Sequence, residues 1–146
     1  MKREKKFRSW NIPNNYMYYD IQKGVLCEKN GLMVIGASFE TICKDAGSIV
    51  MQYTGSKDKN QAGNDVYEGD LFEIIFGNVP NGFSPMNFKE EQIQVIGEVV
   101  FKWDGFHIKF IHPETNENAY FGLWEFLKND EKIVIGNVCE NPNLCN

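Results

Sequence analysis

Cysteine and histidine are the residue types of this chain best suited to metal binding or nucleophilic chemistry, and their spacing indicates neither role. The four cysteines lie far apart, at Cys27, Cys43, Cys139 and Cys145. No two of them form a C-x-x-C pair, and neither His107 nor His112 is close to one in the sequence. Structural zinc needs four ligands that converge tetrahedrally. We therefore expect reduced cysteines with structural or incidental roles, and no metal site.

A polar segment in the middle of the chain carries enough oxygen ligands to be tested as a calcium-binding loop. Asp58 and Asn60 would take positions one and three of the loop, with Gly63 at position six. Ala62 then falls at position five and Gly69 at position twelve, where the loop requires an oxygen donor and a bidentate glutamate. The match fails at both positions. The sequence predicts that these Asx and glycine residues form a turn.

The sequence contains no motif typical of an enzyme. It lacks a phosphate-binding loop, a dinucleotide fingerprint, an H-E-x-x-H pair and a G-x-S-x-G elbow. Glu68, Asp70 and the pair Glu90-Glu91 fall in presumed loops, where carboxylates are more often solvated than catalytic. We predict no catalytic residue and no cofactor. A hydrolase that uses carboxylates alone is an alternative, because the separation of two carboxylates is not visible in a sequence.

Charge is distributed unevenly along the 146 residues. The net charge is −5, and residues 1–8 contribute +4, which leaves −9 on the other 138 residues. An acidic body repels phosphate, so strong nonspecific binding to nucleic acid is disfavoured. The basic arm is either an ordinary solvated end or first strand, or a candidate nucleic-acid contact. Its basic residues are Lys2, Arg3, Lys5, Lys6 and Arg8.

Composition places the chain among globular, cytoplasmic proteins. Hydrophobic residues make up 42% of it and aromatic residues 14%, and thirteen glycines separate short apolar runs, which favours strands joined by turns. The basic start is not followed by the apolar segment of a secretory signal. The apolar runs are far shorter than the roughly 18 residues of a membrane span. We expect a cytoplasmic protein without membrane association.

Two β-hairpins are expected in residues 1–45. A Pro-Asn turn separates two aromatic segments within residues 6–20. Asn30-Gly31 supplies the positive φ of a tight turn between Val25-Leu26 and the apolar run that starts at Leu32. These hairpins precede the predicted barrel core.

Residues 46–146 are expected to form a small β-barrel. A Gly69-Asp70 corner leads into an alternating apolar strand, and such corners enter strands in many small SH3-like barrels. Glycine permits φ > 0 there, and the carboxylate of Asp70 can accept backbone N–H groups. A last strand is predicted over residues 133–138. Helical spacing over 119–128 predicts one short helix, with Trp124 in the core.

A third hairpin is predicted around the two-residue turn Asp104-Gly105. This turn pairs Trp103 with Phe106, Phe101 with Ile108 and Val99 with Phe110. All six side chains then share one buried face, because side chains alternate along a strand. The other face carries His107 opposite Lys102, with no acidic group to orient it, so we expect a surface histidine and not a general base.

Residues 77–92 form a long irregular loop in this prediction. Loops of this length are uncommon in compact domains and are often functional. Three apolar side chains in it could contact a partner or attach the loop to its own domain. This candidate interaction surface consists of Phe83, Met86 and Phe88.

Motifs near both ends and in the middle of the chain carry a family resemblance. They are Lys6-Phe7-Arg8-Ser9-Trp10 with Met17-Tyr18-Tyr19, Met51 to Asn60 with Val66 to Asp70, and Ile135 to Pro142. With these motifs the chain resembles the YopX-like family encoded by phages and prophages, over almost its whole length. Two departures are that Gln61 and Ala62 lengthen the turn before Gly63, and that Val66 replaces a more usual isoleucine.

The resemblance implies one mainly-β domain over residues 1–146, with an SH3-like barrel or roll, an N-terminal hairpin region and oligomerisation. The family resembled has no established enzymatic activity, so no catalytic residue is carried over. We predict a non-catalytic interaction or assembly module that associates with itself or with a phage or host protein. Accessory binding of nucleic acid through the basic arm is the alternative.

Overall fold

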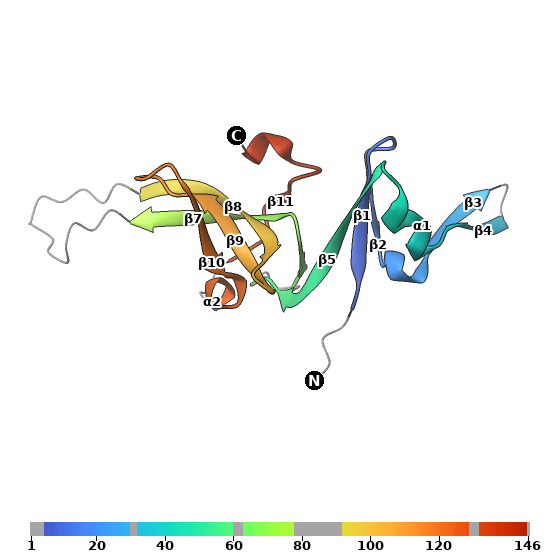
Figure 1. Ribbon diagram of the computed structural model, residues 1–146, viewed down its shortest axis with the longest axis horizontal. Helices are drawn as coiled ribbons and strands as arrows, with labels where there is room; N and C mark the ends of the chain where they lie inside the picture. Colours follow the sequence, from blue (N-terminus) through green and yellow to red (C-terminus); the bar gives the residue numbers. More distant parts are fainter. Residues whose placement is uncertain (1–4, 30–31, 60–62, 78–91, 129–131, 146) are drawn as a thin grey trace, which may run out of the picture.

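The computed structural model describes residues 5–29, 32–59, 63–77, 92–128 and 132–145. It confirms a mainly-β fold, built from a four-stranded sheet, a separate two-stranded hairpin and a five-stranded sheet curled into a half-barrel. The molecule is elongated, with the N-terminal elements at one end and the half-barrel at the other (Figure 1). The long strand β5 (Ser48–Lys57) runs from the first group of elements toward the second.

The four-stranded sheet is antiparallel and has the strand order β2-β1-β5-β6. The predicted hairpin over residues 6–20 is confirmed as β1 (Phe7–Asn11) and β2 (Tyr16–Tyr19). β6 (Asp65–Tyr67) pairs with β5 on the other side. In the centre of the sheet, Arg8 lies opposite Tyr19 on one side and Met51 on the other.

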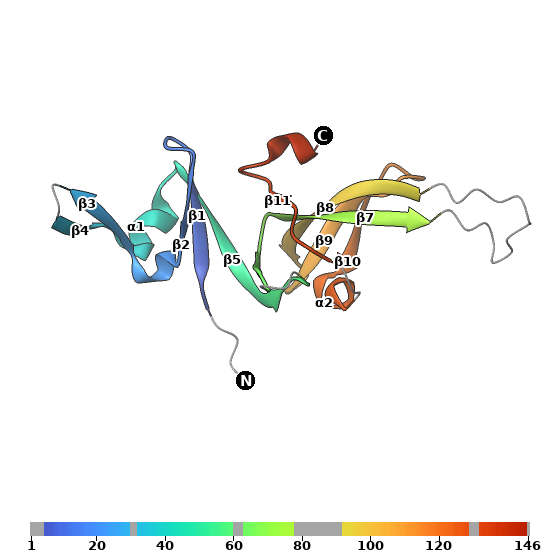
Figure 2. The same cartoon turned by 180° about the vertical axis from the view of Figure 1, so that it is seen from behind.

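The second predicted hairpin is confirmed as well. A short 3-10 turn, η1 (Ile21–Lys23), leads into β3 (Val25–Lys29), which pairs with β4 (Leu32–Ala37). Its predicted Asn30-Gly31 turn lies outside the described residues. The hairpin extends away from the rest of the molecule (Figure 2).

The sequence analysis missed a helix, α1 (Phe39–Lys44). Ser38 begins it by accepting the Thr41 backbone N–H at 3.2 Å, a typical N-cap arrangement. Ile42 is buried, and the Phe39 ring centroid lies 5.0 Å from that of Phe7. The helix is short enough that its apolar period was not visible in the sequence.

The half-barrel has the strand order β10-β9-β8-β7-β11. Its strands are β7 (Asp70–Gly77), β8 (Gln92–Lys102), β9 (Gly105–Ile111), β10 (Asn118–Gly122) and β11 (Gly136–Asn137). The inner face carries the main apolar core, and α2 (Leu123–Leu127) closes it, with the Phe126 ring 5.4 Å from that of Phe72. A final 3-10 turn, η2 (Pro142–Cys145), ends the described chain.

The predicted helix over 119–128 is wrong in its first half. Residues 118–122 form β10, and the helix begins only at Leu123. Leu123, Phe126 and Leu127 point into the core, which leaves Trp124 69% exposed on the opposite side of the helix. Trp124 is therefore not a core residue. The predicted last strand over 133–138 is also shorter, because only Gly136 and Asn137 pair with β7.

The predicted register of the β8–β9 hairpin is wrong by two residues. Phe101 lies opposite Phe106 and Val99 opposite Ile108, so Trp103 and Asp104 form the turn. On β9, the predicted inward residues Phe106, Ile108 and Phe110 do face the core. On the β8 side, Phe101 is 50% exposed and Trp103 is 67% exposed. This register brings Glu98 opposite Lys109 and places the Phe101 and Phe106 rings 5.1 Å apart. Such cross-strand pairs can outweigh the better turn residues Asp104-Gly105.

A test of the core follows from Gly97, which lies on the inner face of β8. A Cβ atom there would overlap the Ile108 side chain and lie 2.8 Å from Cδ1 of Ile74. We expect Gly97→Ala to lower the free energy of unfolding by about 1–3 kcal/mol, as overpacking does. Gly122→Ala is the matched control, since a Cβ at Gly122 meets nothing within 4 Å. Urea denaturation measures both variants, and equal effects would contradict this packing.

Candidate interaction surface

Arg8 connects the first sheet to the half-barrel. Its Nη2 donates to Oδ1 of Asp70 at 2.6 Å and to the backbone carbonyl of Glu68 at 3.1 Å. Asp70 accepts the Tyr67 backbone N–H at 2.8 Å through Oδ2, as predicted for the Gly-Asp corner. Both charged side chains are almost fully buried. Burial raises the pKa of Asp70, while Arg8 opposes this shift.

Gly69 makes the same corner possible. Its φ is +84°, a left-handed conformation that glycine adopts without strain. A Cβ on Gly69 would lie 2.9 Å from Sδ of Met51, so the close packing also requires glycine. The Gly69 N–H donates to the Val99 carbonyl at 2.8 Å, and its own carbonyl accepts the Val138 N–H at 2.9 Å. The corner therefore contacts β8 and the residue that follows β11.

The remaining charged residues of the central motif are also held by internal contacts. Asp65 accepts Nζ of Lys6 and Nζ of Lys57, each at 2.6 Å. Asp58 is buried and accepts the backbone N–H groups of Asn64 and Val134 at 2.9 and 3.0 Å. Asp58 thus ties the polar turn to the chain before the last strand.

The C-terminal motif forms a closed turn. The side-chain oxygen of Asn137 accepts the N–H groups of Cys139 and Glu140, and that of Asn141 accepts the Asn137 N–H. A Cβ at Gly136 would overlap the Asn141 side chain. In the described parts of the three motif regions, Arg8, Asp58, Asp70, Asn137 and Asn141 therefore contribute to folding through internal hydrogen bonds.

In the described part of the basic arm, residues 5–8, the basic side chains do not share one exposed surface. Arg8 is 3% exposed and paired with Asp70, so its guanidinium is not available to phosphate. Lys6 is partly buried and bound to Asp65, and Lys5 is exposed. Lys2 and Arg3 lie outside the described residues. Arg8 and Lys6 are thus engaged in ion pairs within the chain, and the nucleic-acid contact stays a prediction.

The three loop residues of the other predicted surface, Phe83, Met86 and Phe88, also lie outside the described residues. Where the chain is described, no group of three or more His, Cys, Asp or Glu side chains is placed to hold a metal ion. None of the described helices has the length and apolar character needed to cross a membrane.

Exposed aromatic residues gather at the tip of the β8–β9 hairpin. The Trp103 ring centroid lies 5.3 Å from that of His107 and 5.0 Å from that of Tyr120, both in edge-to-face geometry. Nζ of Lys102 lies 4.7 Å from the Trp103 ring and 4.2 Å from the Tyr120 ring, and donates to the Tyr120 hydroxyl at 3.0 Å. We call Lys102, Trp103, His107 and Tyr120 the tip cluster.

The backbone at the tip is strained. Trp103 and Asp104 have φ values of +52° and +59°, so the turn requires the left-handed conformation at both residues. That conformation suits glycine, asparagine or aspartate and is unusual for a bulky side chain. The turn holds the Trp103 ring at the surface at a cost in stability, which is a pattern common at functional positions.

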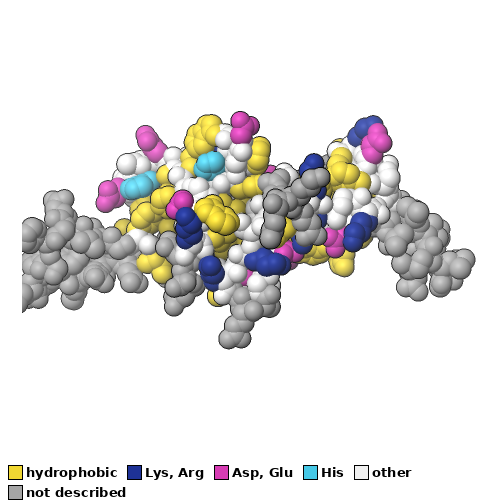
Figure 3. Space-filling model, turned by 90° about the horizontal axis from the view of Figure 1, so that it is seen from below, with side chains coloured by type: hydrophobic (Ala, Val, Ile, Leu, Met, Phe, Trp, Pro, Cys, Tyr) yellow, Lys and Arg dark blue, Asp and Glu magenta, His cyan; other side chains and the backbone are white. Residues whose placement is uncertain are grey.

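Figure 3 shows exposed hydrophobic side chains over the half-barrel, with acidic and basic side chains scattered between them. The sequence predicted a hairpin here, but with the Trp103 side chain on its buried face. Two adjacent residue pairs, Trp103-Asp104 and Asp104-Gly105, could form the two-residue turn. The preference of hairpin turns for Asp-Gly favours Asp104-Gly105, but the structure uses Trp103-Asp104.

Comparison with known proteins agrees with the fold. A family model described as YopX protein matches residues 6–146. No curated protein matches the chain. Among solved structures, a crystal structure of protein EF1440 from Enterococcus faecalis has a TM-score of 0.57 and 21% sequence identity. That match covers 99% of this chain and 100% of the other. At this identity the likeness concerns the fold.

Two substitutions of Trp103 separate backbone strain from the loss of ring contacts. Trp103→Ala and Trp103→Asn both remove the ring, but asparagine tolerates the left-handed conformation better than alanine does. We expect the asparagine variant to be more stable than the alanine variant by about 0.5–1 kcal/mol. Chemical denaturation provides the measurement, and identical stabilities would show that the turn is not strained at this residue.

Proposed function

Since the chain belongs to the YopX protein family, with its motif residues engaged in folding, we propose that it is a non-catalytic interaction or assembly module. Its partner is a second copy of itself or another phage or host protein. The setting we propose is the cytoplasm of a cell that carries the phage or prophage. The tip cluster, which lies outside the family motifs, supports this function most directly, because it offers an exposed contact surface.

The chemistry of the tip cluster suits a protein partner. Tryptophan and tyrosine are enriched among the residues that dominate binding energy in protein interfaces. Trp103 exposes two thirds of its surface, and its edge-to-face contacts with His107 and Tyr120 fix the ring before any partner arrives. A ring that is already ordered loses little conformational entropy on binding.

Charge around the tip favours protein over nucleic acid. Asp104 is exposed beside Trp103, and Lys102 is engaged with Tyr120. Arg8 is buried with Asp70 and Lys6 is bound to Asp65, so both of these basic groups are already neutralised by carboxylates of the chain. The nucleic-acid alternative depends on base stacking at Trp103 and becomes one outcome of the experiment below.

Photo-crosslinking from the tip tests the proposal. Replacing Trp103 by p-benzoylphenylalanine in the full chain, in cells that carry the whole phage or prophage, should give a protein adduct of defined mass after irradiation. The matched control carries the same group at Trp124, which is equally exposed, at 69%, but lies on α2. We expect an adduct at position 103 and none at 124.

The mass of the adduct identifies the partner as a second copy or as another protein. An adduct with nucleic acid would favour the alternative function. Equal capture at both positions, or none at position 103, would contradict the tip cluster as the contact surface.

A further inference from the structure

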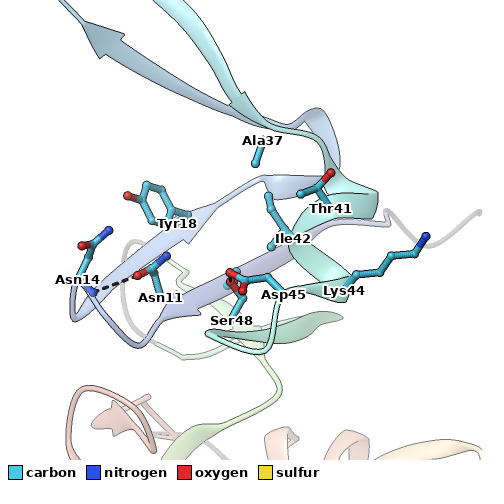
Figure 4. A pocket seen from close by; sticks show the side chains of 10 residues that line it. Asn11, Asn14, Tyr18, Ala37, Thr41, Ile42, Lys44, Asp45 and Ser48 are labelled. Atoms are coloured by element: carbon cyan, nitrogen blue, oxygen red, sulfur yellow. Dashed lines mark hydrogen bonds between the residues drawn. The ribbon is translucent and has the colours of Figure 1, made fainter.

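A groove lies at the other end of the molecule, between α1 and the first sheet (Figure 4). Its volume is about 590 Å³, within the usual range for small-molecule sites. The floor comes from β1, β2 and the start of β5, and one wall comes from α1. Polar residues around the groove are Ser9, Asn11, Asn14, Tyr18, Thr41, Asp45 and Ser48.

Several of these polar groups have hydrogen-bonding capacity to spare. Ser9 is only 2% exposed, yet its hydroxyl makes no hydrogen bond to any described residue. The same is true, within the described chain, of the Tyr18 hydroxyl and of the Asn14 side chain. These groups can therefore bond a ligand or water in the groove.

The charges of the groove restrict the ligand. Asp45 accepts the Gly47 N–H and the Ser48 hydroxyl, each at 3.0 Å, and these bonds lower the pKa of its carboxyl group. Lys44 points away from the groove (Figure 4) and binds Glu40 at 2.8 Å. Among the described residues that line the groove, Asp45 supplies a carboxylate, and the one cation, Lys44, extends away from it. An anionic ligand such as a phosphate ester is disfavoured.

The apolar part of the groove lining narrows the class of ligand further. Ile42 and Ala37 form an apolar strip on the helix side, and the Tyr18 ring faces the groove from β2. A sugar ring has an apolar C–H face that packs on an aromatic ring, and hydroxyl groups at its edge for amide, hydroxyl and carboxylate partners. We propose that this groove binds a neutral carbohydrate unit.

The test is a titration of the full-length ¹⁵N-labelled protein with a panel of neutral methyl glycosides and disaccharides. We expect saturable shifts, with millimolar dissociation constants, confined to β1, β2, α1 and the start of β5. Absence of saturable shifts up to tens of millimolar, or shifts centred elsewhere, would overturn the proposal. Saturable binding of uncharged peptides in place of the sugars would overturn it too.

Variants that delete single hydroxyl groups make the test specific. Tyr18→Phe and Ser9→Ala remove groups that make no hydrogen bond within the described chain, so folding should be retained. Each should weaken sugar binding threefold to tenfold, the effect of one lost hydrogen bond. Tyr19→Phe, on the same strand but the opposite face, is the control and should bind as the parent does. Unchanged affinity in both groove variants would overturn the proposed site.

Discussion

The buried ion pair between Arg8 and Asp70 is the contact on which the arrangement of the two sheets depends. The sheets share no strand, and the chain passes from one to the other through the corner at Gly69. Arg8 reaches that corner from the centre of the first sheet and bonds both the Asp70 carboxylate and the Glu68 carbonyl. Asp70 in turn holds the Tyr67 N–H at the end of β6.

Burying two charges costs desolvation free energy, which is offset only when nearly all of their hydrogen-bonding groups have partners. Three hydrogen bonds offset the cost of burying Arg8 and Asp70, and the Arg8 guanidinium also lies 4.7 Å from the Tyr67 ring. Nε of Arg8 is buried without a partner among the described residues, so the compensation is incomplete. Such a pair contributes specificity more than stability: it fixes one relative placement of the sheets, because any other leaves both charges unpaired. Arg8, Glu68, Gly69 and Asp70 all lie in the sequence motifs by which the chain resembles the YopX-like family.

The two surfaces that we propose as binding sites lie away from this joint. The tip cluster lies on the half-barrel, and the groove lies beside α1 on the first sheet. Neither surface uses the residues that hold the sheets together. A partner bound at one surface and a ligand bound at the other would therefore be kept at a fixed separation, provided that the joint is rigid.

The sequence predicted the elements that local chemistry decides. Paired aromatic segments, the Asn-Gly turn and the Gly69-Asp70 corner led to the correct hairpins and fold class. Predictions from the sequence were wrong where long-range packing determines the strand register or the direction of a side chain. The turn Asp104-Gly105 is locally better than Trp103-Asp104, but cross-strand pairs shift the register by two residues. Helical spacing suggested a buried Trp124, but β10 ends at Gly122 and turns the helix so that this side chain faces out. Arg8 and Asp70 are 62 residues apart, so no local pattern could join them.

A double-mutant cycle on Arg8 and Asp70 tests the central claim most directly. Equilibrium unfolding of Arg8→Met, Asp70→Asn and the double variant gives the coupling free energy between the two side chains. If the pair joins the sheets as described, each single variant should lose about 3–5 kcal/mol, because it leaves a buried group without its partner. The double variant should then lose clearly less than the sum of the two. Small single effects that simply add would show that the two residues do not act as one contact, and would contradict this account of the fold.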